Sequence, residues 1–298
     1  MKKTLFAALI GRPNVGKSTL LNYMLGTKVS IVSNKPQTTR TRITGVMSRG
    51  ETQYVFLDTP GIHKPKNKLG ATMVKTANSA LGDVDVVLWL VEAGDKIGEI
   101  ETSLIGRFKS EDIPAVLLIN KTDKSNAEEI GETILRFSAE MAFAAVIPIS
   151  AKTGDNVNDI FGEIDRFAYE GDWIFPDDMF TDQPERVIAS EIIREKLLQT
   201  LDKEVPHGTA VVIEEFSESD EMIKIRAEIF CEKASHKPII IGKGGKELKL
   251  VGTRAREDME RFFGTKVYLD LWVKVKENWR ESEAMISNFG LQNNDDFQ

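Results

Sequence analysis

The sequence has few of the residues that mark secreted, metal-rich or membrane-spanning proteins. It holds one cysteine, Cys231, and three histidines among 298 residues. A single thiol excludes an internal disulfide and a site built from several cysteines, so we expect Cys231 to be a buried free thiol. The longest apolar runs, such as Val86–Val91, have the length of a strand and not of a bilayer-spanning helix. The first residues do not form a signal-peptide pattern, and these absences together favour a cytoplasmic protein.

Excess positive charge is also lacking. The formal net charge is −7, which argues against a chain that coats nucleic acid through its overall charge. One stretch runs against this balance: Glu232–Arg256 contains five lysines, two arginines and only two acids. A basic patch on an acidic protein indicates an anionic partner that binds at one place.

Strand-length apolar runs alternate with amphipathic helix-length segments over the first half of the chain. This alternation is typical of an α/β domain, in which helices cover both faces of a mostly parallel sheet. The expected strands are Leu5–Ile10, Tyr54–Leu57, Val84–Val91, Ala115–Ile119 and Val146–Ile149, and the expected helices are Ser18–Leu25, Ile100–Phe108 and Glu128–Met141. The segments Thr44–Met47 and Gln53–Leu57, joined by a short polar turn, predict an antiparallel hairpin at one edge.

The pattern changes near residue 173, where a polar, proline-containing stretch predicts a linker over 173–185. We therefore expect one domain over 1–172, a second over 186–290 and a flexible tail over 291–298. The second domain has the order helix, strand, strand, helix, helix, strand. Its expected elements are Ile188–Leu201, Thr209–Phe216, Ile223–Phe230, Ala234–Ile241, Glu247–Phe263 and a last strand in which Val267, Leu269, Leu271, Val273 and Val275 share one face.

A phosphate-binding loop follows the first expected strand. The stretch Gly11–Ser18 fits G-x-x-x-x-G-K-[S/T] at every position. Its two glycines let the backbone curl so that N–H groups point at phosphate oxygens. Lys17 supplies charge to the β- and γ-phosphates, and Ser18 opens a helix whose N-terminus favours anions and whose hydroxyl can bind Mg²⁺. The expected phosphate-binding residues are Gly11, Asn14, Val15, Gly16, Lys17, Ser18 and Thr19.

Three further segments, each expected at the carboxyl end of a strand, add a base and a metal to this site. Asp58–Gly61 offers a carboxylate for Mg²⁺ and an N–H that can reach a γ-phosphate. Asp123 can accept both the N1–H and the 2-amino group of guanine, a pair of donors that adenine lacks. The Ala151 N–H can donate to guanine O6. Because such strand ends meet at one edge of an open α/β sheet, a guanine-nucleotide site is predicted; its further residues are Asp58, Gly61, Asn120, Lys121, Asp123, Ser150, Ala151 and Lys152.

These motifs together resemble the set found in translation-factor-type GTPases. The resemblance implies that Pro36–Arg40 lies in the first switch, whose threonine joins the Mg²⁺ ligands when GTP is bound. Thr39 is favoured over Thr38 because it directly precedes an arginine. The implied metal ligands are Ser18, Thr39 and Asp58, and the implied catalytic residues for hydrolysis of GTP to GDP and phosphate are Lys17, Thr39, Gly61 and Asn14.

The residue after Gly61 differs from that in Ras-like GTPases, which place a water-orienting glutamine there. Ile62 has no side-chain hydrogen-bonding group, so hydrolysis is expected to be slow in the protein alone or to depend on a cation. In similar GTPases an asparagine at the place of Asn14 helps to bind K⁺. K⁺-stimulated turnover is therefore one hypothesis, and a purely loop-shaping Asn14 is the other. A general-base role for His63 is disfavoured, because phosphoryl transfer depends more on positioning and charge than on proton abstraction.

A second glycine-rich turn lies between two helical patterns of the C-terminal part. Its glycines would let a nucleic-acid backbone approach closely, and its lysines and the following helix N-terminus favour phosphates. Ile239, Ile240 and Ile241 are candidates for an apolar floor under bases. The order of elements around the turn resembles a type II KH domain, which binds about four nucleotides of single-stranded nucleic acid. The expected RNA-binding residues are Ile241, Gly242, Lys243, Gly244, Gly245 and Lys246.

The combination of both domains, with Ala189–Lys196 at their junction and Leu271–Lys276 near the end, resembles the bacterial Era GTPase family over roughly residues 3–290. The resemblance implies binding of the 3′ end of 16S ribosomal RNA, a switch role in 30S subunit assembly, GTP, GDP and Mg²⁺ as ligands, and peripheral contact with the inner face of the membrane in some members. We expect a monomer. Two alternatives stay open: an RNA-binding module with a nucleotide as structural ligand, and a GTPase acting with a tRNA-modifying or membrane partner.

Overall fold

The computed structural model describes residues 1–82 and 84–292, and the chain forms two compact units. Unit 1 comprises Met1–Ser30, Thr39–Pro65 and Met73–Asp182, and unit 2 comprises Ile31–Thr38, Lys66–Thr72 and Gln183–Gln298. The division is not a single cut of the chain, because two short N-terminal segments belong with the C-terminal part. The sequence-based domain limits therefore stay predictions.

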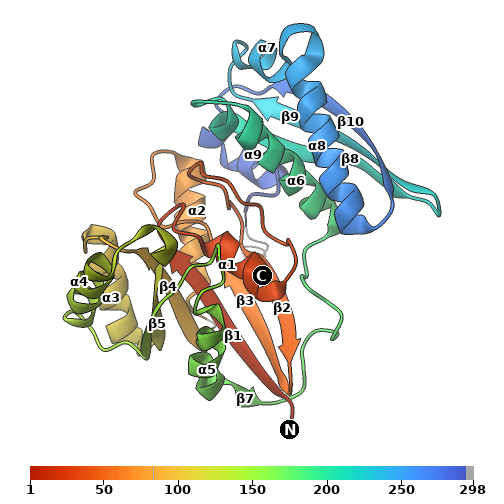
Figure 1. Ribbon diagram of the computed structural model, residues 1–298. Helices are drawn as coiled ribbons and strands as arrows, with labels where there is room; N and C mark the ends of the chain where they lie inside the picture. Colours follow the sequence, from red (N-terminus) through yellow and green to blue (C-terminus); the bar gives the residue numbers. More distant parts are fainter. Residues whose placement is uncertain (83, 293–298) are drawn as a thin grey trace. The chain divides into compact units, whose positions relative to one another are not determined.

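Unit 1 is built on a sheet with strand order β2-β3-β1-β4-β5-β6 (Figure 1). β1, β3, β4, β5 and β6 pair in parallel, whereas β2 runs antiparallel to β3 and forms the predicted edge hairpin. The strands are β1 (Lys3–Gly11), β2 (Ile43–Arg49), β3 (Thr52–Asp58), β4 (Val86–Glu92), β5 (Ala115–Asn120), β6 (Ala145–Pro148) and β7 (Tyr169–Glu170), which pairs with the start of β1. The α/β prediction is confirmed.

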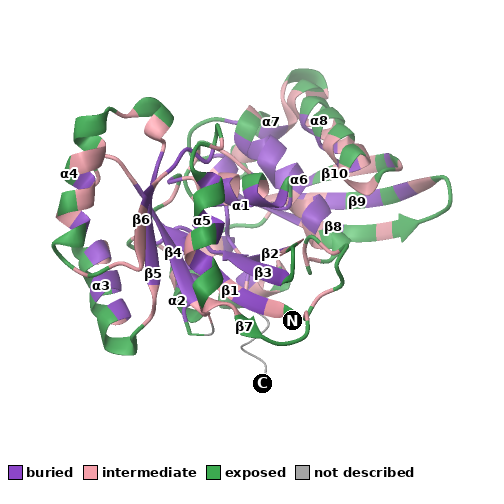
Figure 2. Ribbon diagram, turned by 60° about the horizontal axis from the view of Figure 1, so that its bottom comes forward, coloured by how far each residue is buried: buried purple, intermediate pink, exposed green. Residues whose placement is uncertain are grey.

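Apolar cores on both faces explain why the central strands are apolar throughout. On one face, Leu5 and Leu9 of β1 pack with residues of helices α1 (Lys17–Leu25) and α5 (Val157–Ile164). On the other, Ala8 and Ile10 pack with α2 (Lys68–Ser79), α3 (Glu99–Glu111) and α4 (Ala127–Ser138), and Figure 2 shows the buried strands between these helix layers. The sequence pattern did not predict α2 and α5. The α5 helix is only two turns long, too short to show a clear 3.6-residue period.

The stretch expected as a linker has no helix or strand until Glu185, but much of it is held against unit 1. The side chain of Gln53 in β3 binds its backbone three times, donating to Phe175 O at 2.8 Å and accepting from Ile174 N at 2.9 Å and from Phe175 N at 3.0 Å. Val46 N of β2 donates to Phe180 O at 2.9 Å. The Val46 bond occupies a backbone group of the edge strand β2, which would otherwise be available to pair with another strand.

Unit 2 places helices over a sheet with strand order β10-β9-β8 (Figure 1). β10 runs parallel to β9, and β8 antiparallel to it. The elements are α6 (Glu185–Thr200), β8 (Thr209–Glu218), β9 (Met222–Cys231), α7 (His236–Ile241), α8 (Lys246–Phe263), β10 (Lys266–Val275) and α9 (Glu283–Asn288). The order confirms the predicted KH-like arrangement. Helix α9 was not predicted, and Phe289, directly after it, stacks on Phe230 of β9.

Three smaller expectations can be compared with the fold. Cys231 is a buried free thiol, as predicted, and burial raises its pKa. Of the tail expected over 291–298, Leu291 is buried, and residues 293–298 lie outside the described part of the chain. Among the described residues, no helix is both long and apolar enough to cross a membrane.

Candidate functional site

The loop between β1 and α1 closes around the ammonium group of Lys17. Lys17 Nζ donates to the carbonyls of Gly11 at 3.2 Å and Arg12 at 3.1 Å, so the side chain curls back across the loop. A Cβ on Gly11 would lie 2.4 Å from Leu90 O, and one on Gly16 would lie 2.2 Å from the Asn120 amide nitrogen. Glycine is therefore required at both positions by close packing as well as by positive φ angles of 145° and 109°.

Hydroxyl groups from three parts of unit 1 converge on Asp58 at the end of β3. Ser18 Oγ donates to Asp58 Oδ2 at 2.6 Å, Ser30 Oγ at 2.9 Å and Thr39 Oγ1 at 3.5 Å. The hydroxyls of Ser18 and Thr39 lie 2.9 Å apart. Thr38 behaves differently, because its hydroxyl donates to Lys35 O at 2.6 Å. The structure thus brings together the three expected metal ligands, with Thr39 and not Thr38 among them.

This donor set fits Mg²⁺. Asp58 is fully buried, and its Oδ1 has no hydrogen-bond partner within the described residues. A buried carboxylate oxygen without a partner is unfavourable, and hard carboxylate and hydroxyl oxygens are the donors that Mg²⁺ prefers. Ser18, Thr39 and Asp58 could therefore hold the ion at two or three positions and leave the others to phosphate and water.

Burial shifts the titration of both charged groups at the centre of the site. Desolvation lowers the pKa of Lys17 to about 8, although the nearby Asp58 opposes the shift. Burial raises the pKa of Asp58, against the effect of Lys17 and of the three hydroxyl donors. Each charge is thus poorly solvated without a ligand, which favours binding of an anion at Lys17 and a cation at Asp58.

The loops after β5 and β6 form the other side of the site. Asn120 joins two loops: its Nδ2 donates to Val15 O at 2.7 Å, and its Oδ1 accepts from Ala151 N at 2.9 Å. Asp123 is exposed, and Ser150 Oγ donates to its Oδ1 at 2.9 Å. The Ala151 N–H, expected to donate to guanine O6, is thus engaged by Asn120 in this structure. The Asp123 carboxylate keeps a solvent-accessible edge, as its expected pairing with guanine requires.

Lys121 and Lys152 occupy the rim of this region. The Lys121 backbone is left-handed at φ 67°, and its ammonium donates to Asn14 O at 2.8 Å and to Glu92 at 2.5 Å. Its stem therefore lies over the phosphate-loop side of the site. Lys152 is exposed, and Thr19 is half-buried on α1.

The structure around Gly61, Ile62 and His63 explains why no glutamine-like group is available after Gly61. Ile62 is buried in the core with Ile10 and Trp89, and its N–H donates to Gly11 O at 3.1 Å. A Cβ on Gly61 would lie 2.6 Å from Pro13 N, so this loop needs glycine to approach the phosphate loop. His63 Nδ1 lies 2.9 Å from Gly61 O.

Several supporting residues carry no sequence motif and were missed. Ser30 binds Asp58 as described, and Asn22 Oδ1 fixes it by accepting from Val29 N at 3.0 Å and Ser30 N at 2.9 Å. Arg12 of the phosphate loop pairs with Glu101 of α3 at 2.7 and 2.8 Å, which raises the pKa of Arg12. Glu101 is almost entirely buried, a position that charged residues rarely take unless paired, but burial is not visible in the sequence.

In unit 2, a pocket of about 290 Å³ lies beside the glycine-rich turn, between α8 and the edge strand β10. Its lining residues are Gly245, Leu248, Lys249, Gly252, Leu269 and Leu271. Gly242, Gly244 and Gly245 have φ angles of 75°, 62° and 79°, so the turn depends on glycine. The expected isoleucine floor was wrong in part: Ile240 is buried in the core, and the apolar walls come from Leu248, Leu269 and Leu271.

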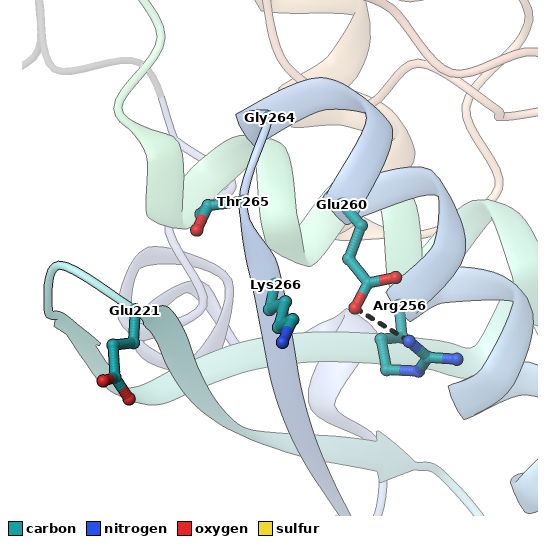
Figure 3. A pocket seen from close by; sticks show the side chains of 6 residues that line it. All are labelled: Glu221, Arg256, Glu260, Gly264, Thr265 and Lys266. Carbon is teal, nitrogen blue, oxygen red and sulfur yellow. Dashed lines mark hydrogen bonds and ion pairs between the residues drawn. The ribbon is translucent and has the colours of Figure 1, made fainter.

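A wider hollow of about 710 Å³ lies at the other end of α8. Figure 3 shows its side chains, with Arg256 paired to Glu260 and with Lys266 and Glu221 facing the same space. Glu260 accepts from Val267 N at 3.2 Å and from Arg256 at 2.8 Å, and these bonds lower the pKa of Glu260. With two acids and two bases, this surface favours neither an anion nor a cation.

The family models that match this chain cover its N-terminal and C-terminal parts separately. A family model described as a 50S ribosome-binding GTPase matches residues 6–121, and one described as a KH domain matches residues 204–280. GTPase Era of Alkaliphilus metalliredigens is 50% identical over 97% of this chain and 99% of its own length, and GTPase Era of Clostridioides difficile is 47% identical over 97% and 99%. The chain belongs to the Era family of GTPases.

Solved structures of Era agree with this fold over the full length. Era in complex with MgGDPNP and nucleotides 1506–1542 of 16S ribosomal RNA has a TM-score of 0.92 and 40% identity, with 98% of this chain and 100% of that chain covered. A variant of Aquifex aeolicus Era bound to GDP and AlF₄⁻ has a TM-score of 0.91 at the same identity and coverage. The predicted order of a P-loop GTPase domain and a KH domain is confirmed.

Proposed function

We propose that this GTPase binds the single-stranded 3′ end of 16S ribosomal RNA through unit 2 and acts as a nucleotide-dependent switch in 30S subunit assembly. The observation that carries the proposal is the full-length likeness to Era in complex with MgGDPNP and a 16S rRNA fragment. The pocket between α8 and β10 supports it, because leucine walls suit bases and the lysines of the turn suit phosphates.

In the proposed nucleotide site, the phosphate loop and Lys17 bind the β- and γ-phosphates, and Asp123 selects guanine. Ser18, Thr39 and Asp58 would hold Mg²⁺, which would supply positive charge against the negative charge that develops during phosphoryl transfer. The convergence of these side chains and the unpartnered Asp58 Oδ1 support this assignment. The remaining residues of the predicted set line the loops around them: Gly11, Asn14, Val15, Gly16, Thr19, Gly61, Asn120, Lys121, Ser150, Ala151 and Lys152.

Water activation in this scheme relies on backbone groups and charge, since Ile62 is buried. We assign a K⁺ ion to the exposed Asn14 as the added charge. The left-handed φ of 64° at Asn14 equally suits a loop-shaping role, because asparagine adopts that conformation more readily than most residues. Turnover measured in KCl and in NaCl at equal ionic strength separates the two: K⁺ dependence supports the ion, and equal rates reject it.

The switch itself is tested by the affinity for a single-stranded RNA oligonucleotide with the 16S 3′-end sequence. Fluorescence anisotropy would compare the protein bound to GDP with the protein bound to a non-hydrolysable GTP analogue. By linkage, any factor by which GTP changes RNA affinity must equal the factor by which RNA changes GTP affinity. Equal RNA affinity in both states would reject the switch while leaving GTPase activity and RNA binding intact.

Two expectations from the family resemblance complete the proposal. We expect the protein to act in the cytoplasm as a monomer, and peripheral contact with the inner membrane face is a further prediction. Flotation with vesicles made of anionic lipids, and analytical ultracentrifugation of the purified chain, check these points directly.

A further inference from the structure

Helix α6 carries three consecutive charged residues in its buried interior. Arg194, Glu195 and Lys196 are 2%, 1% and 7% exposed, and they lie between the buried pairs Ile192–Ile193 and Leu197–Leu198. Burying charges is unfavourable unless each is paired, and apolar side chains of similar size would usually serve stability as well or better. Stability alone therefore does not account for the triplet.

The first two members hold the segment Ile31–Thr38, which belongs to the same unit. Glu195 Oε1 accepts from Val32 N at 2.9 Å, near the start of the segment. Arg194 Nη2 donates to Thr38 O at its end and is itself fixed by Glu191 at 2.5 Å. Between them, Lys35 donates to Leu201 O at the end of α6. The segment is thus held at both ends and in the middle by one helix.

Both residues that flank this segment in the chain bind Asp58. Ser30 directly precedes it and donates to Asp58 Oδ2 at 2.9 Å, and Thr39 directly follows it and lies 2.9 Å from the Ser18 hydroxyl. Because Thr38 and Thr39 share a peptide bond, the place of the Thr38 carbonyl limits where the Thr39 hydroxyl can lie. A hold on Thr38 therefore acts on an expected metal ligand without touching the nucleotide.

The third member extends the contact to the helix that follows the glycine-rich turn. Lys196 Nζ lies 2.8 Å from Glu195 Oε2 and 2.5 Å from Asp258 Oδ2 of α8. Successive helix residues point about 100° apart, so the triplet can reach the segment and α8 at the same time. Asp258 also pairs with Arg261 on its own helix.

We propose that Arg194 and Glu195 are positioning residues for GTP hydrolysis, which set Thr39 through the segment Ile31–Thr38, and that Lys196 connects this hold to α8. The inference rests on the proposed function and names the side chains through which the RNA-binding unit acts on the hydrolysis site. It also gives a role to the charged part of the junction sequence Ala189–Lys196.

The hold is tested by Glu195→Ala in the full-length protein. Glu195→Ala removes the charge-assisted bond to Val32 N, which fixes the start of the segment that ends next to Thr39. The loss should lower kcat about tenfold, whereas GDP affinity should stay within about twofold, because GDP lacks the γ-phosphate that Thr39 serves. Glu195→Gln keeps an oxygen that can accept from Val32 N and should restore most of kcat. The matched control is Glu185→Ala, at an exposed position of the same helix.

A purely structural Glu195 would give a different result: a lower melting temperature with unchanged kcat per folded molecule, or losses in kcat and GDP affinity together that Gln does not rescue. Either result overturns the positioning role. The kcat comparison does not involve RNA, so it can fail while the proposed RNA switch stands, and the switch can fail while the kcat comparison holds.

The connection to α8 is tested by Lys196→Met, which leaves the Val32–Glu195 bond in place. Its kcat should remain within about twofold of the unmodified protein. The ratio of RNA affinities with the GTP analogue and with GDP should move toward one. An unchanged ratio overturns the role of Lys196.

Discussion

The proposed nucleotide site of unit 1 and the pocket beside the glycine-rich turn of unit 2 are built in opposite ways. At the nucleotide site the central groups are polar and buried: Lys17 is 5% exposed and Asp58 is fully buried, and each has several directed partners. The pocket of unit 2 has half-buried leucine walls and one lining lysine, Lys249, and the exposed Lys243 and Lys246 belong to the adjacent glycine-rich turn.

The difference has an energetic consequence. In the nucleotide site, binding depends on a few charge-assisted hydrogen bonds in a dry environment, where one lost group leaves another buried without a partner. In the pocket of unit 2, stacking, apolar contact and screened charge are shared among many side chains. Single substitutions should therefore have large, ligand-specific effects in the first site and smaller, salt-dependent effects in the second.

The largest effect is expected from Asp123→Asn. An asparagine can accept one hydrogen bond from guanine but turns an amide N–H toward the other donor, so GTP affinity should fall about 10³-fold. Xanthosine triphosphate, which carries an acceptor at that position, should bind better to the variant than to the unmodified protein. Competition binding with GTP and xanthosine triphosphate measures this change in nucleotide preference.

The control for this change is RNA affinity in the absence of nucleotide, which should be unaltered. If GTP still bound the Asp123→Asn protein with unmodified affinity, guanine selection would not depend on this carboxylate. The exposed side chain at Lys152 offers a matched variant, Lys152→Ala, for which a much smaller loss is expected.

The next effect is expected from Lys17→Ala, which removes the ammonium from the centre of the phosphate loop. Affinity for GTP should fall about 100-fold, because the β- and γ-phosphates lose a charge-assisted donor in a buried site. Guanosine, which has the same base without phosphates, should bind the variant and the unmodified protein equally. A similar loss for both ligands would indicate a collapsed loop and would contradict a specific phosphate role.

The places of Lys17 and Asp123 in the fold were predictable, because both belong to motifs that directly follow strand-length apolar runs. Glycine, lysine and aspartate at fixed spacings after apolar runs are rarely found without a bound nucleotide, and the sheet places all strand ends at one edge. Ser30 was not predictable, because a loop serine acquires its role only when the fold brings it within 2.9 Å of Asp58. The pocket of unit 2 was predictable in part. The glycine-rich turn could be recognised in the sequence, but the walls of the pocket come from alternate residues of β10 and from α8.

The sequence also did not reveal which residues are buried. Ile240 has the same side chain as its neighbours, yet it is in the core, whereas Ile239 is 49% exposed. Similarly, Arg194, Glu195 and Lys196 look like a solvated helix face, since charged residues are seldom buried. Only the packing of α6 in the fold shows that they are enclosed.

The turn of unit 2 should respond more weakly to substitution. The double change Lys243→Glu and Lys246→Glu reverses two charges beside the pocket and should weaken binding of a single-stranded RNA about 10- to 50-fold at low salt. The loss should shrink as salt rises, because the contacts are screened, and GTP affinity should be unaffected. A loss that is independent of salt would contradict the electrostatic character assigned to this turn.

The smallest effect is a pH dependence confined to the nucleotide site. Lys17 has a pKa of about 8 without ligand, below the ordinary value of 10.5, because of burial. Above pH 8 GTP binding must take up a proton, so affinity should fall as pH rises, by about tenfold between pH 7 and pH 9. Isothermal titration calorimetry at several pH values measures this fall. Guanosine has no phosphates, so its affinity should not change as Lys17 loses its proton.

The same pKa shift predicts the opposite trend for stability. Between pH 8 and 10.5 the unfolded chain keeps the Lys17 proton that the nucleotide-free folded protein has lost, so the contribution of Lys17 to the free energy of unfolding rises with pH in that window. The Lys17→Ala protein should lack both trends, whereas RNA binding at Lys243 and Lys246 should show neither. An unchanged GTP affinity from pH 7 to 9 would mean that Lys17 is better solvated than its buried position implies. The nucleotide site and the pocket of unit 2 would then differ less in how far their charged groups are shielded from water.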